Sequence, residues 1–281
     1  MYKIILQGEQ ISEEKILELA PTIKLAHFFQ RANLSSFTLE QSPNNETIQA
    51  LRNNFAGDVN VLPGDFDRSA VKLVVSDMDS TLINIECVDE IADFAGVKDK
   101  VSAVTEAAMR GELDFAESLI ARVALLKGLN VNALQKVYEQ RLKLNPGAEE
   151  MLAKLKANNI RFALVSGGFS FFTDRLKTRL DLDYTLSNTL ERDGDVLTGN
   201  VTGVIVGGEA KAAFLLEKCK ELGIAPSQAV AIGDGANDLL MMAEAGLGVA
   251  YHAKPKVQLE ADCALNYTGL EGLSGLLGLS D

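Results

Sequence analysis

Two different hydrophobic patterns divide the chain near residue 70. Before that point, short apolar segments alternate with polar ones at the spacing of a small α+β module. Strands are predicted at residues 3–7, 23–29, 35–41 and 58–63, and helices at 12–20 and 47–55. This order predicts a ferredoxin-like domain over residues 1–68. The segment 23–29 fits a helix as well as a strand, and the Gly-, Pro- and Asp-rich residues 57–70 have the composition of a linker.

After residue 70, short buried runs end in Gly, Ser or Asp and alternate with amphipathic helical patterns. The runs are VKLVVSD (71–77), RFALVSGG (161–168), AVAIGDG (229–235) and GLGVA (246–250). Such alternation predicts a Rossmann-like parallel sheet covered by helices. Asp193-Gly194, between two strand-like segments, predicts a hairpin.

The long segment between the first two runs contains only helical patterns. A stretch of this length is typical of a domain insertion rather than a loop. We therefore predict a helical cap over residues 86–145, inserted into an α/β core formed by residues 69–85 and 146–281. The cap and core together make a catalytic domain of residues 69–281.

Polar side chains gather where the buried runs end. Asp77 and Asp79 follow the first run, Ser166 the second, and Asp234 the third. In parallel sheets these carboxyl ends meet at one edge, where ligands bind. Each group taken alone also fits a turn or a helix cap. Together, several carboxylates at one edge predict a site for Mg²⁺, which prefers oxygen ligands.

Phosphoryl transfer is the reaction that fits such a set. A carboxylate can attack phosphorus while a metal and a lysine neutralise the phosphoryl oxygens. An acid two residues further on can protonate the leaving oxygen and then deprotonate water. Lys211 follows a glycine pair at a helix start, although taken alone it also fits an exposed surface lysine.

Four segments resemble, in order, the four motifs of the haloacid dehalogenase superfamily. They are Asp77-Met78-Asp79-Ser80-Thr81, Ser166-Gly167-Gly168, Lys211 and Gly233-Asp234-Gly235-Ala236-Asn237-Asp238. The resemblance covers residues 71–270. Residues 77–92 (DMDSTLINIECVDEIA) and the cap are similar to the phosphoserine phosphatase family within it.

The resemblance implies a role for each matching residue. Asp77 would be the nucleophile and a metal ligand, and Asp79 the general acid and base, with its main-chain carbonyl on the metal. Asp234 would be the second carboxylate ligand. The phosphoryl group would be held by Ser166, Lys211, Asn237 and the Gly167 amide, while Asp238 would orient Lys211 or metal-bound water.

Two cap residues are candidates for substrate selection. Glu86 could pair with an ammonium group, although an acid in the first turn of a helix is also favoured by the helix dipole. Arg122 falls within an apolar stripe formed by Phe115, Leu119, Val123 and Leu126. It fits either an arginine extending from the stripe edge to water or a guanidinium that binds a carboxylate. The resemblance assigns Glu86 and Arg122 to the two charged groups of phosphoserine.

The composition of the chain indicates which binding partners and which cellular location to expect. The 281 residues contain 27 Lys+Arg and 39 Asp+Glu, a net charge of −12, which disfavours binding to nucleic acid. There are only two histidines, so histidine-based catalysis is not expected. Three widely spaced cysteines, no signal-peptide pattern and no long apolar run predict a cytoplasmic protein without membrane spans.

Alternatives remain at this stage. Another phosphatase or mutase of the superfamily shares the same motifs, and receiver-like signalling domains also use Asp, Mg²⁺ and Lys. Such signalling domains are shorter and lack both the cap and the second aspartate. The N-terminal module contains no ligand motif, and it could sense an amino acid, form a homodimer or stabilise the catalytic part.

Overall fold

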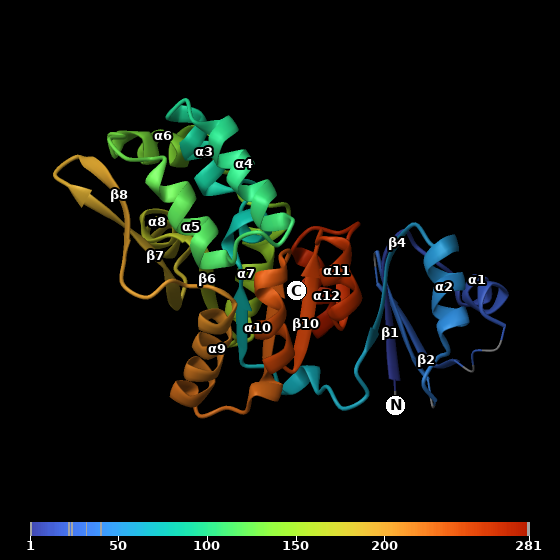
Figure 1. Cartoon of the computed structure of the whole chain (residues 1–281). Coiled ribbons are helices and arrows are strands. Elements are labelled where there is room, and N and C mark those ends of the chain that lie inside the picture. Colours follow the sequence, from blue (N-terminus) through green and yellow to red (C-terminus); the bar gives the residue numbers. More distant parts are fainter. Residues whose placement is uncertain (1, 22, 24, 32, 40, 280–281) are drawn as a thin grey trace.

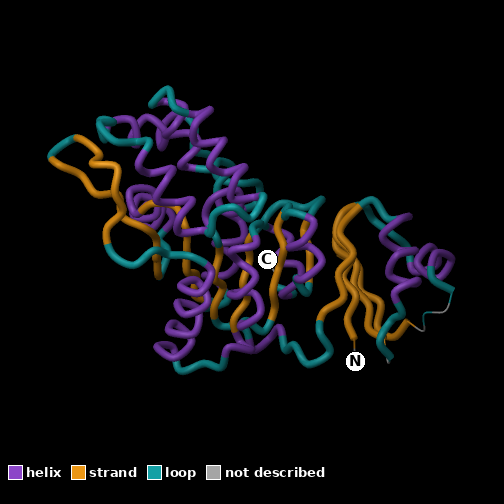
Figure 2. Tube along the Cα trace, viewed as in Figure 1, coloured by secondary structure: helices purple, strands orange, loops and turns teal. Residues whose placement is uncertain are grey.

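The computed structural model describes residues 2–279 except 22, 24, 32 and 40, and for Met109 only the backbone. Two sheets form separate layers that lie side by side (Figures 1 and 2). The first sheet has the strand order β2-β3-β1-β4 and is antiparallel, with both helices on one face. Its elements are β1 (Tyr2–Gly8), α1 (Glu13–Leu19), β2 (Leu25–Arg31), β3 (Leu34–Leu39), α2 (Asn45–Asn54) and β4 (Gly57–Leu62).

This order confirms the predicted ferredoxin-like module, and it shows that the ambiguous segment 23–29 contributes to strand β2. Both helices begin at a capping side chain. Ser12 accepts a hydrogen bond from the Lys15 amide at 3.2 Å, and Asn44 accepts one from the Thr47 amide at 2.8 Å. Alternate residues of β1 then bury Ile4 against the helices, as the period-two pattern requires.

The second sheet carries most of the residues predicted to form the site. Its order is β11-β10-β9-β5-β6-β7-β8, parallel except for the β7–β8 hairpin predicted at Asp193-Gly194. The strands are β5 (Leu73–Ser76), β6 (Arg161–Phe169), β7 (Tyr184–Asp193), β8 (Val196–Thr202), β9 (Ala229–Gly233), β10 (Leu247–Tyr251) and β11 (Cys263–Leu265). The covering helices are α7 (Ala148–Ala157), α8 (Ser170–Leu180), α9 (Gly208–Leu222), α10 (Leu239–Glu244), α11 (Pro255–Glu260) and α12 (Glu271–Leu277).

The register of this sheet places the predicted site. Ser76, at the end of β5, pairs with Leu164 of β6 on one side and Ile232 of β9 on the other. The residues that follow these three strands therefore meet at one edge. The parallel sheet with helices on both faces confirms the predicted Rossmann-like core (Figure 2).

The inserted segment is helical, as predicted, and stands above the carboxyl edge of the sheet (Figure 1). It contains α3 (Cys87–Phe94), α4 (Lys98–Met109), α5 (Phe115–Ala124) and α6 (Asn132–Gln140). Its two connections to the core run side by side, with the Asn84 amide bonded to the Lys143 carbonyl at 3.0 Å. Asn145 then ties them to the core by donating to the carbonyls of Thr81 and Ile83 at 2.8 and 3.1 Å.

Strand β4 (57–62) confirms the strand predicted at 58–63, whereas the linker prediction for residues 57–70 was wrong over this part. Asp58 and Asn60 have the polar composition of a linker, yet they are only 3% and 1% exposed. Their side chains bond to the backbone of residues 264–268 in the catalytic domain. Local composition could not show this, because the partners lie about two hundred residues away in the sequence.

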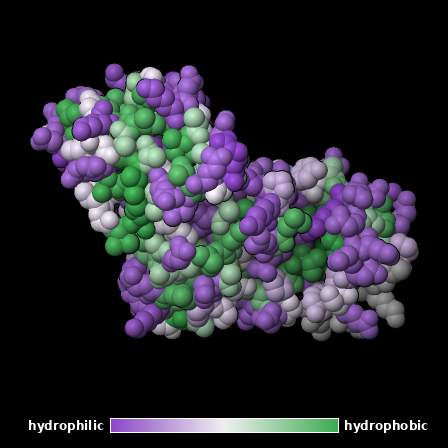
Figure 3. Space-filling model, viewed as in Figure 1, coloured by the Kyte–Doolittle hydropathy of each residue, from purple (hydrophilic) through white to green (hydrophobic). Residues whose placement is uncertain are grey.

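The cap rises from the core as a separate lobe, leaving a step in the outline beside the N-terminal module (Figure 3). Hydrophilic residues predominate on the upper part of this lobe. Among the described residues, no helix is long and apolar enough to cross a membrane.

Candidate active site

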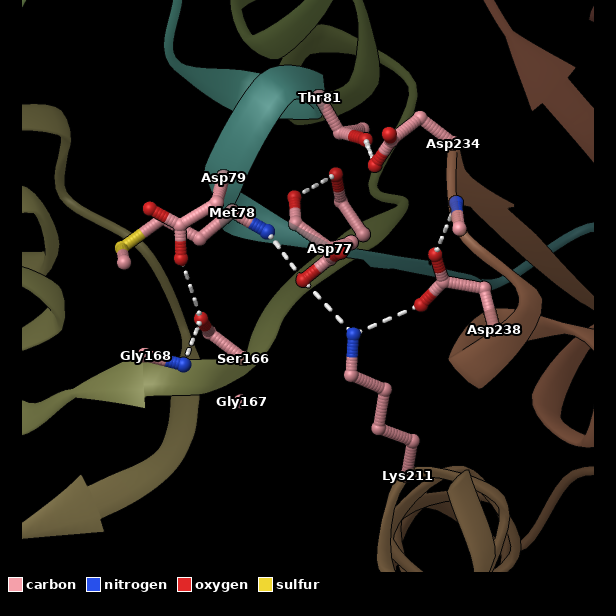
Figure 4. A network of polar contacts seen from close by, with 12 residues as sticks. Asp77, Met78, Asp79, Thr81, Ser166, Gly167, Gly168, Lys211, Asp234 and Asp238 are labelled. Carbon is pink, nitrogen blue, oxygen red and sulfur yellow. Dashed lines mark hydrogen bonds and ion pairs between the residues drawn. The ribbon is translucent and has the colours of Figure 1, made fainter. Parts of the chain in front are cut away.

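Asp77 lies directly after β5, and its backbone fixes it against β9. Its amide donates to the Ile232 carbonyl at 2.9 Å. Its Oδ1 accepts a hydrogen bond from the Met78 amide at 2.7 Å and lies 2.8 Å from the Lys211 ammonium (Figure 4). Asp77 is only 5% exposed, and these two contacts hold its carboxylate in place at the carboxyl edge of the sheet.

Lys211 reaches this carboxylate from the first turn of α9. It is completely buried and also contacts Asp238 Oδ1 at 2.7 Å (Figure 4). Burial alone would lower the pKa of Lys211, but attraction by Asp238 and Asp77 outweighs it and raises the pKa. The surface-lysine alternative is therefore wrong, and Lys211 is a buried cation between two acids.

A third carboxylate gives this cluster an excess of negative charge. Oxygen atoms of Asp77, Asp234 and Asp238 lie within 4.8 Å of one another, with Lys211 as the ion-pair partner of two of them. Burial, and then repulsion by Asp238, raises the pKa of Asp234 to about 6. Acids that repel one another in this way are stabilised when a cation lies among them.

The donor set fits a hard divalent cation. Both oxygens of Asp238 are already used, one by Lys211 and the other by the Gly235 amide at 3.1 Å. Asp234 accepts only a long hydrogen bond from the Thr81 hydroxyl, at 3.4 Å. Asp77 and Asp234 thus keep oxygen atoms for a metal, whereas Asp238 positions Lys211. Because only oxygen donors are present, the set suits Mg²⁺ better than zinc or copper.

Asp79 is held by the cap on one side and the core on the other. Its Oδ1 accepts the Cys87 amide at the start of α3 at 2.8 Å, and its Oδ2 accepts the Ser166 hydroxyl at 3.2 Å (Figure 4). Burial raises the pKa of Asp79 despite these hydrogen bonds. A raised pKa is the direction that favours a proton on a group acting as general acid.

Backbone strain accompanies this arrangement. Between Asp79 and the cap, Ser80 has φ +55°, which is unfavourable for a residue with a side chain. Its hydroxyl donates to Glu86 Oε1 at 2.7 Å. The strained turn therefore joins Ser80, the residue after Asp79, to Glu86, the cap acid predicted to bind an ammonium group.

Glu86 and Arg122 lie in the cap near the same cleft. Partial desolvation by the cleft walls, followed by repulsion from Asp79, raises the pKa of Glu86 to about 7, although its side chain remains open to solvent. Arg122 is half-buried and donates to its own helix at the Ser118 carbonyl, 3.3 Å away. It forms no ion pair with any described acid. Burial lowers the pKa of Arg122, and attraction by Asp89 and Glu86 opposes this in part.

The apolar stripe around Arg122 is buried as predicted. Leu119 and Val123 are almost completely buried, while Leu126 lies beyond the end of α5 and is buried in the turn that follows. Phe115, at the start of the helix, covers the glycine loops. A methyl group added at Gly167 would lie only 2.6 Å from the Phe115 ring. Glycine at this position therefore allows the cap to close over the cleft.

Asn188 is a residue that sequence analysis missed. It lies on β7, is 1% exposed, and joins two loops of the site. Its side chain donates to the Gly167 carbonyl and accepts from the Val206 amide, both at 2.8 Å. Gly167 follows Ser166, and Val206 precedes the glycine pair that begins the Lys211 helix. A single polar residue in a hairpin strand gave no sequence signal for this function.

The structure brings together six of the ten predicted site residues in one polar network. They are Asp77, Asp79, Ser166, Lys211, Asp234 and Asp238. Gly167 borders this network (Figure 4), whereas Glu86 and Arg122 belong to the cap, where Glu86 accepts the hydrogen bond from Ser80 and Arg122 bonds only to its own helix. Asn237 lies in the turn after β9, and among the described residues no hydrogen bond joins its side chain to the network.

Comparisons with known proteins identify the class. Residues 71–246 match the family model of the haloacid dehalogenase-like hydrolases. The phosphoserine phosphatase of Polaromonas sp. is 56% identical over 224 residues, which cover 78% of this chain and 95% of that protein. The crystal structure of a probable phosphoserine phosphatase from Vibrio cholerae has a TM-score of 0.84 at 38% identity, covering 99% of this chain and 86% of the other.

A third relative was solved as a phospho-aspartyl intermediate analogue of phosphoserine phosphatase. Its TM-score is 0.68 at 40% identity, and the match covers 72% of this chain and 97% of the other. The chain therefore belongs to the haloacid dehalogenase-like hydrolases. Within that class it is a member of the phosphoserine phosphatase family, whose enzymes are phosphoric monoester hydrolases. This confirms the family predicted from the motifs.

Proposed function

We propose that the protein hydrolyses O-phospho-L-serine to L-serine and phosphate, the last step of serine biosynthesis, with Mg²⁺ and an aspartyl-phosphate intermediate. The observation that carries the proposal is the fixed pair of acids after β5. Asp77 faces Lys211 at the base of the cleft, while Asp79 is held apart by Cys87 and Ser166. The names of the relatives support the substrate and the intermediate.

Asp77 is the proposed nucleophile. One of its carboxylate oxygens forms a bond to phosphorus as the bond from phosphorus to the serine oxygen breaks. Asp79 donates its proton to that serine oxygen, which leaves as a hydroxyl. Lys211, with Asp238 holding its ammonium group, lies beside Asp77 and offsets negative charge on the transferring group.

The second half of the reaction regenerates the acids. Asp79, now a carboxylate, takes a proton from a water molecule whose oxygen bonds to phosphorus. The bond from phosphorus to Asp77 breaks, releasing phosphate and restoring the carboxylate. Asp77, Asp234 and the main-chain carbonyl of Asp79 are the proposed holders of Mg²⁺. The chemistry that the metal supplies is further neutralisation of the phosphoryl oxygens.

The loops around the polar network are proposed to bind the phosphoryl group. Ser166, the Gly167 amide and Asn237 are proposed to hold phosphoryl oxygens together with Lys211. Ser166 already bonds to the Gly168 amide at 2.8 Å, which orients its hydroxyl in the loop. Asn237 makes no such bond with a described residue and remains a proposal from the motif.

Glu86 and Arg122 are proposed to select the amino-acid part of the substrate. Glu86 would bind its ammonium group and Arg122 its carboxylate. Arg122 forms no ion pair with any described acid, so a substrate carboxylate would have an available guanidinium. Another phosphatase or mutase activity would not require this pair of opposite charges.

A phosphate-release panel with and without Mg²⁺ tests the proposal. Phosphoserine should be the best of a set of small phosphomonoesters, and chelation of Mg²⁺ should abolish release. Stable phosphorylation of Asp77 without turnover would instead support a receiver-like signalling function. A better rate with a phosphate ester that lacks both charged groups would support a different phosphatase of the same class.

Arg122→Ala provides the sharper test of substrate selection. We expect kcat/KM for phosphoserine to fall about 100-fold, because a charge-assisted contact to the carboxylate is lost. Phosphoethanolamine, which lacks the carboxylate, should lose less than about three-fold. Arg110→Ala is the matched control, since Arg110 is an exposed cap arginine paired with Glu112. Equal losses on both substrates would remove Arg122 from substrate recognition.

We further propose a cytoplasmic enzyme in which the N-terminal module stabilises the catalytic part or mediates a homodimer. Its contacts with residues 264–268 support the stabilising function. The mass of the full chain in solution, compared with that of residues 69–281, tests dimer formation through the module.

A further inference from the structure

A second cavity lies between the N-terminal module and the catalytic domain, away from the proposed active site. Its volume is about 900 Å³, within the range of pockets that bind small metabolites. β1 and β3 form one wall and α12 the other, and Figure 1 shows α12 facing the N-terminal sheet. None of the ten candidate active-site residues lines it.

Three acids, Glu9, Glu150 and Glu271, line this cavity, but two of its cations have no acidic partner among the described residues. Lys3 on β1 and Arg68 in the connection between the domains are both partly buried, and neither forms an ion pair with any described residue. They are close enough that burial and then repulsion by Arg68 lower the pKa of Lys3. Burial also lowers the pKa of Arg68. In a chain of net charge −12, two neighbouring cations without a counter-ion are unusual.

A buried polar side chain lines the same cavity. Gln7 lies on the same face of β1 as Lys3, because residues two and four apart point the same way. It is 5% exposed and donates from Nε2 to the Gly272 carbonyl at 2.9 Å. Its Oε1 has no hydrogen-bond partner among the described residues. A buried acceptor left in this state requires a donor from a ligand or water.

On the opposite wall, glycines let the backbone lie close to polar side chains of the N-terminal module and of the connection between the domains. Gly272 and Gly275 on α12 and Gly278, which directly follows the helix, recur every three residues and all line the cavity. A methyl group at Gly275 would lie 2.4 Å from Gln7 Nε2, and one at Gly278 would lie 2.6 Å from the Arg68 guanidinium. Glycine at these positions keeps both polar groups at the cavity wall, which also includes Ser36 of β3, the partner of Ile5 in the sheet.

We propose that this cavity binds a small molecule with an oxyanion, either a carboxylate or a phosphate, held by Lys3 and Arg68. A hydroxyl or ammonium group elsewhere on the ligand would donate to Gln7 Oε1. The ligand would contact both domains at once and would stabilise their association by mass action. This site is independent of the proposed phosphatase reaction.

Amide chemical shifts of the full-length ¹⁵N-labelled protein test the proposal, with inorganic sulfate as the oxyanion probe. Saturable shifts are expected at Gly275 and Gly278. Malonate and methylphosphonate then distinguish a carboxylate from a phosphate source, because the preferred class should saturate at lower concentration. Resonances near Lys211 report any separate binding at the active site.

The double variant Lys3→Gln/Arg68→Gln should weaken sulfate binding at Gly275 and Gly278 about ten-fold or more, because two charged donors are lost. Lys72→Gln is the matched control, since Lys72 is exposed and does not line the cavity. Phosphatase activity should be unchanged in both, which also shows that the variants fold. Absence of shifts at Gly275 and Gly278, or equal affinity in the double variant and the control, would overturn the proposal.

Discussion

Asp77 in the active site and Asp58 at the domain interface are both buried carboxylates, with 5% and 3% exposure, but their surroundings are opposite. Asp58 accepts hydrogen bonds from the amides of Asn266, Tyr267 and Thr268, and from the Thr268 hydroxyl. Its charge is offset by neutral donors fixed in one loop. Asp77 instead faces other acids and shares Lys211 with Asp238.

The difference separates a structural carboxylate from a reactive one. Asp58 has enough donors, so nothing further is required to stabilise its charge. Around Asp77, burial and then repulsion by Asp238 raise its pKa well above the usual range. The charge of such a group is stabilised when a cation arrives, and perturbed carboxyl groups of this kind are typical of functional sites. Substitutions should therefore affect activity at one position and stability at the other.

The largest effect is expected from Asp77→Asn. Loss of the nucleophile should lower kcat for phosphoserine by about 10⁴-fold or more. Stability should change by less than about 1 kcal/mol, because Lys211 keeps its ion pair with Asp238 and no cation is left alone. Steady-state phosphate release and urea unfolding of the same preparation measure the two quantities. Substantial residual turnover would contradict the assignment of Asp77 as nucleophile.

Asp58→Ala should show the opposite behaviour. Three amides and one hydroxyl lose a buried acceptor, so the free energy of unfolding should fall by about 2–4 kcal/mol. The rate per folded molecule should be unchanged, since no site residue contacts Asp58. Asp65→Ala, at an exposed acid in the connecting segment, is the control and should stay within about 0.5 kcal/mol of the wild type. A loss of kcat without a loss of stability would contradict a purely structural function for Asp58.

The two carboxylates also show what sequence could and could not predict. Asp77 was found because it ends a buried strand and belongs to a spaced set of acids whose chemistry is coherent. Periodicity likewise predicted both sheets and the helical cap. Asp58 fell within both the predicted strand 58–63 and the linker 57–70, but its burial was not predicted, because its partners at residues 266–268 come together with it only in the folded chain. Burial of a polar residue by a distant segment has no local signature.

Asn188 was missed for the same physical reason. Its two partners, Gly167 and Val206, belong to separate loops that become neighbours only through the order of the sheet. Lys211 was predicted in part. Its position in the motif was recognised, but its complete burial followed only from the packing of α9 against the sheet.

Asn188 resembles Asp58 in joining separate backbone segments by hydrogen bonds, but its side chain is neutral and it lies in the proposed active site. It therefore extends the comparison to a bridging residue that should affect activity. Asn188→Leu should leave the Gly167 carbonyl and the Val206 amide without partners and displace both loops. We expect kcat/KM for phosphoserine to fall about ten- to thirty-fold, with most of the loss in kcat. Asn188→Asp keeps the acceptor for Val206 and should recover part of KM but not of kcat. A change in stability alone, with unchanged kinetics in folded protein, would make Asn188 purely structural.

The smallest effect concerns Glu86, whose pKa of about 7 makes its charge depend on pH near neutrality. A carboxyl with a raised pKa is neutral below that value, so its attraction for a substrate ammonium is present above pH 7 and lost as pH falls. The ionised fraction rises about three-fold between pH 6.5 and 7.5. We therefore expect kcat/KM for phosphoserine, relative to phospholactate, which lacks the ammonium, to rise up to about three-fold over this interval. Both substrates share the titration of the phosphate, so their ratio isolates the ammonium contact. Glu86→Gln should remove the pH dependence of the ratio, and persistence of that dependence in the variant would assign it to another group.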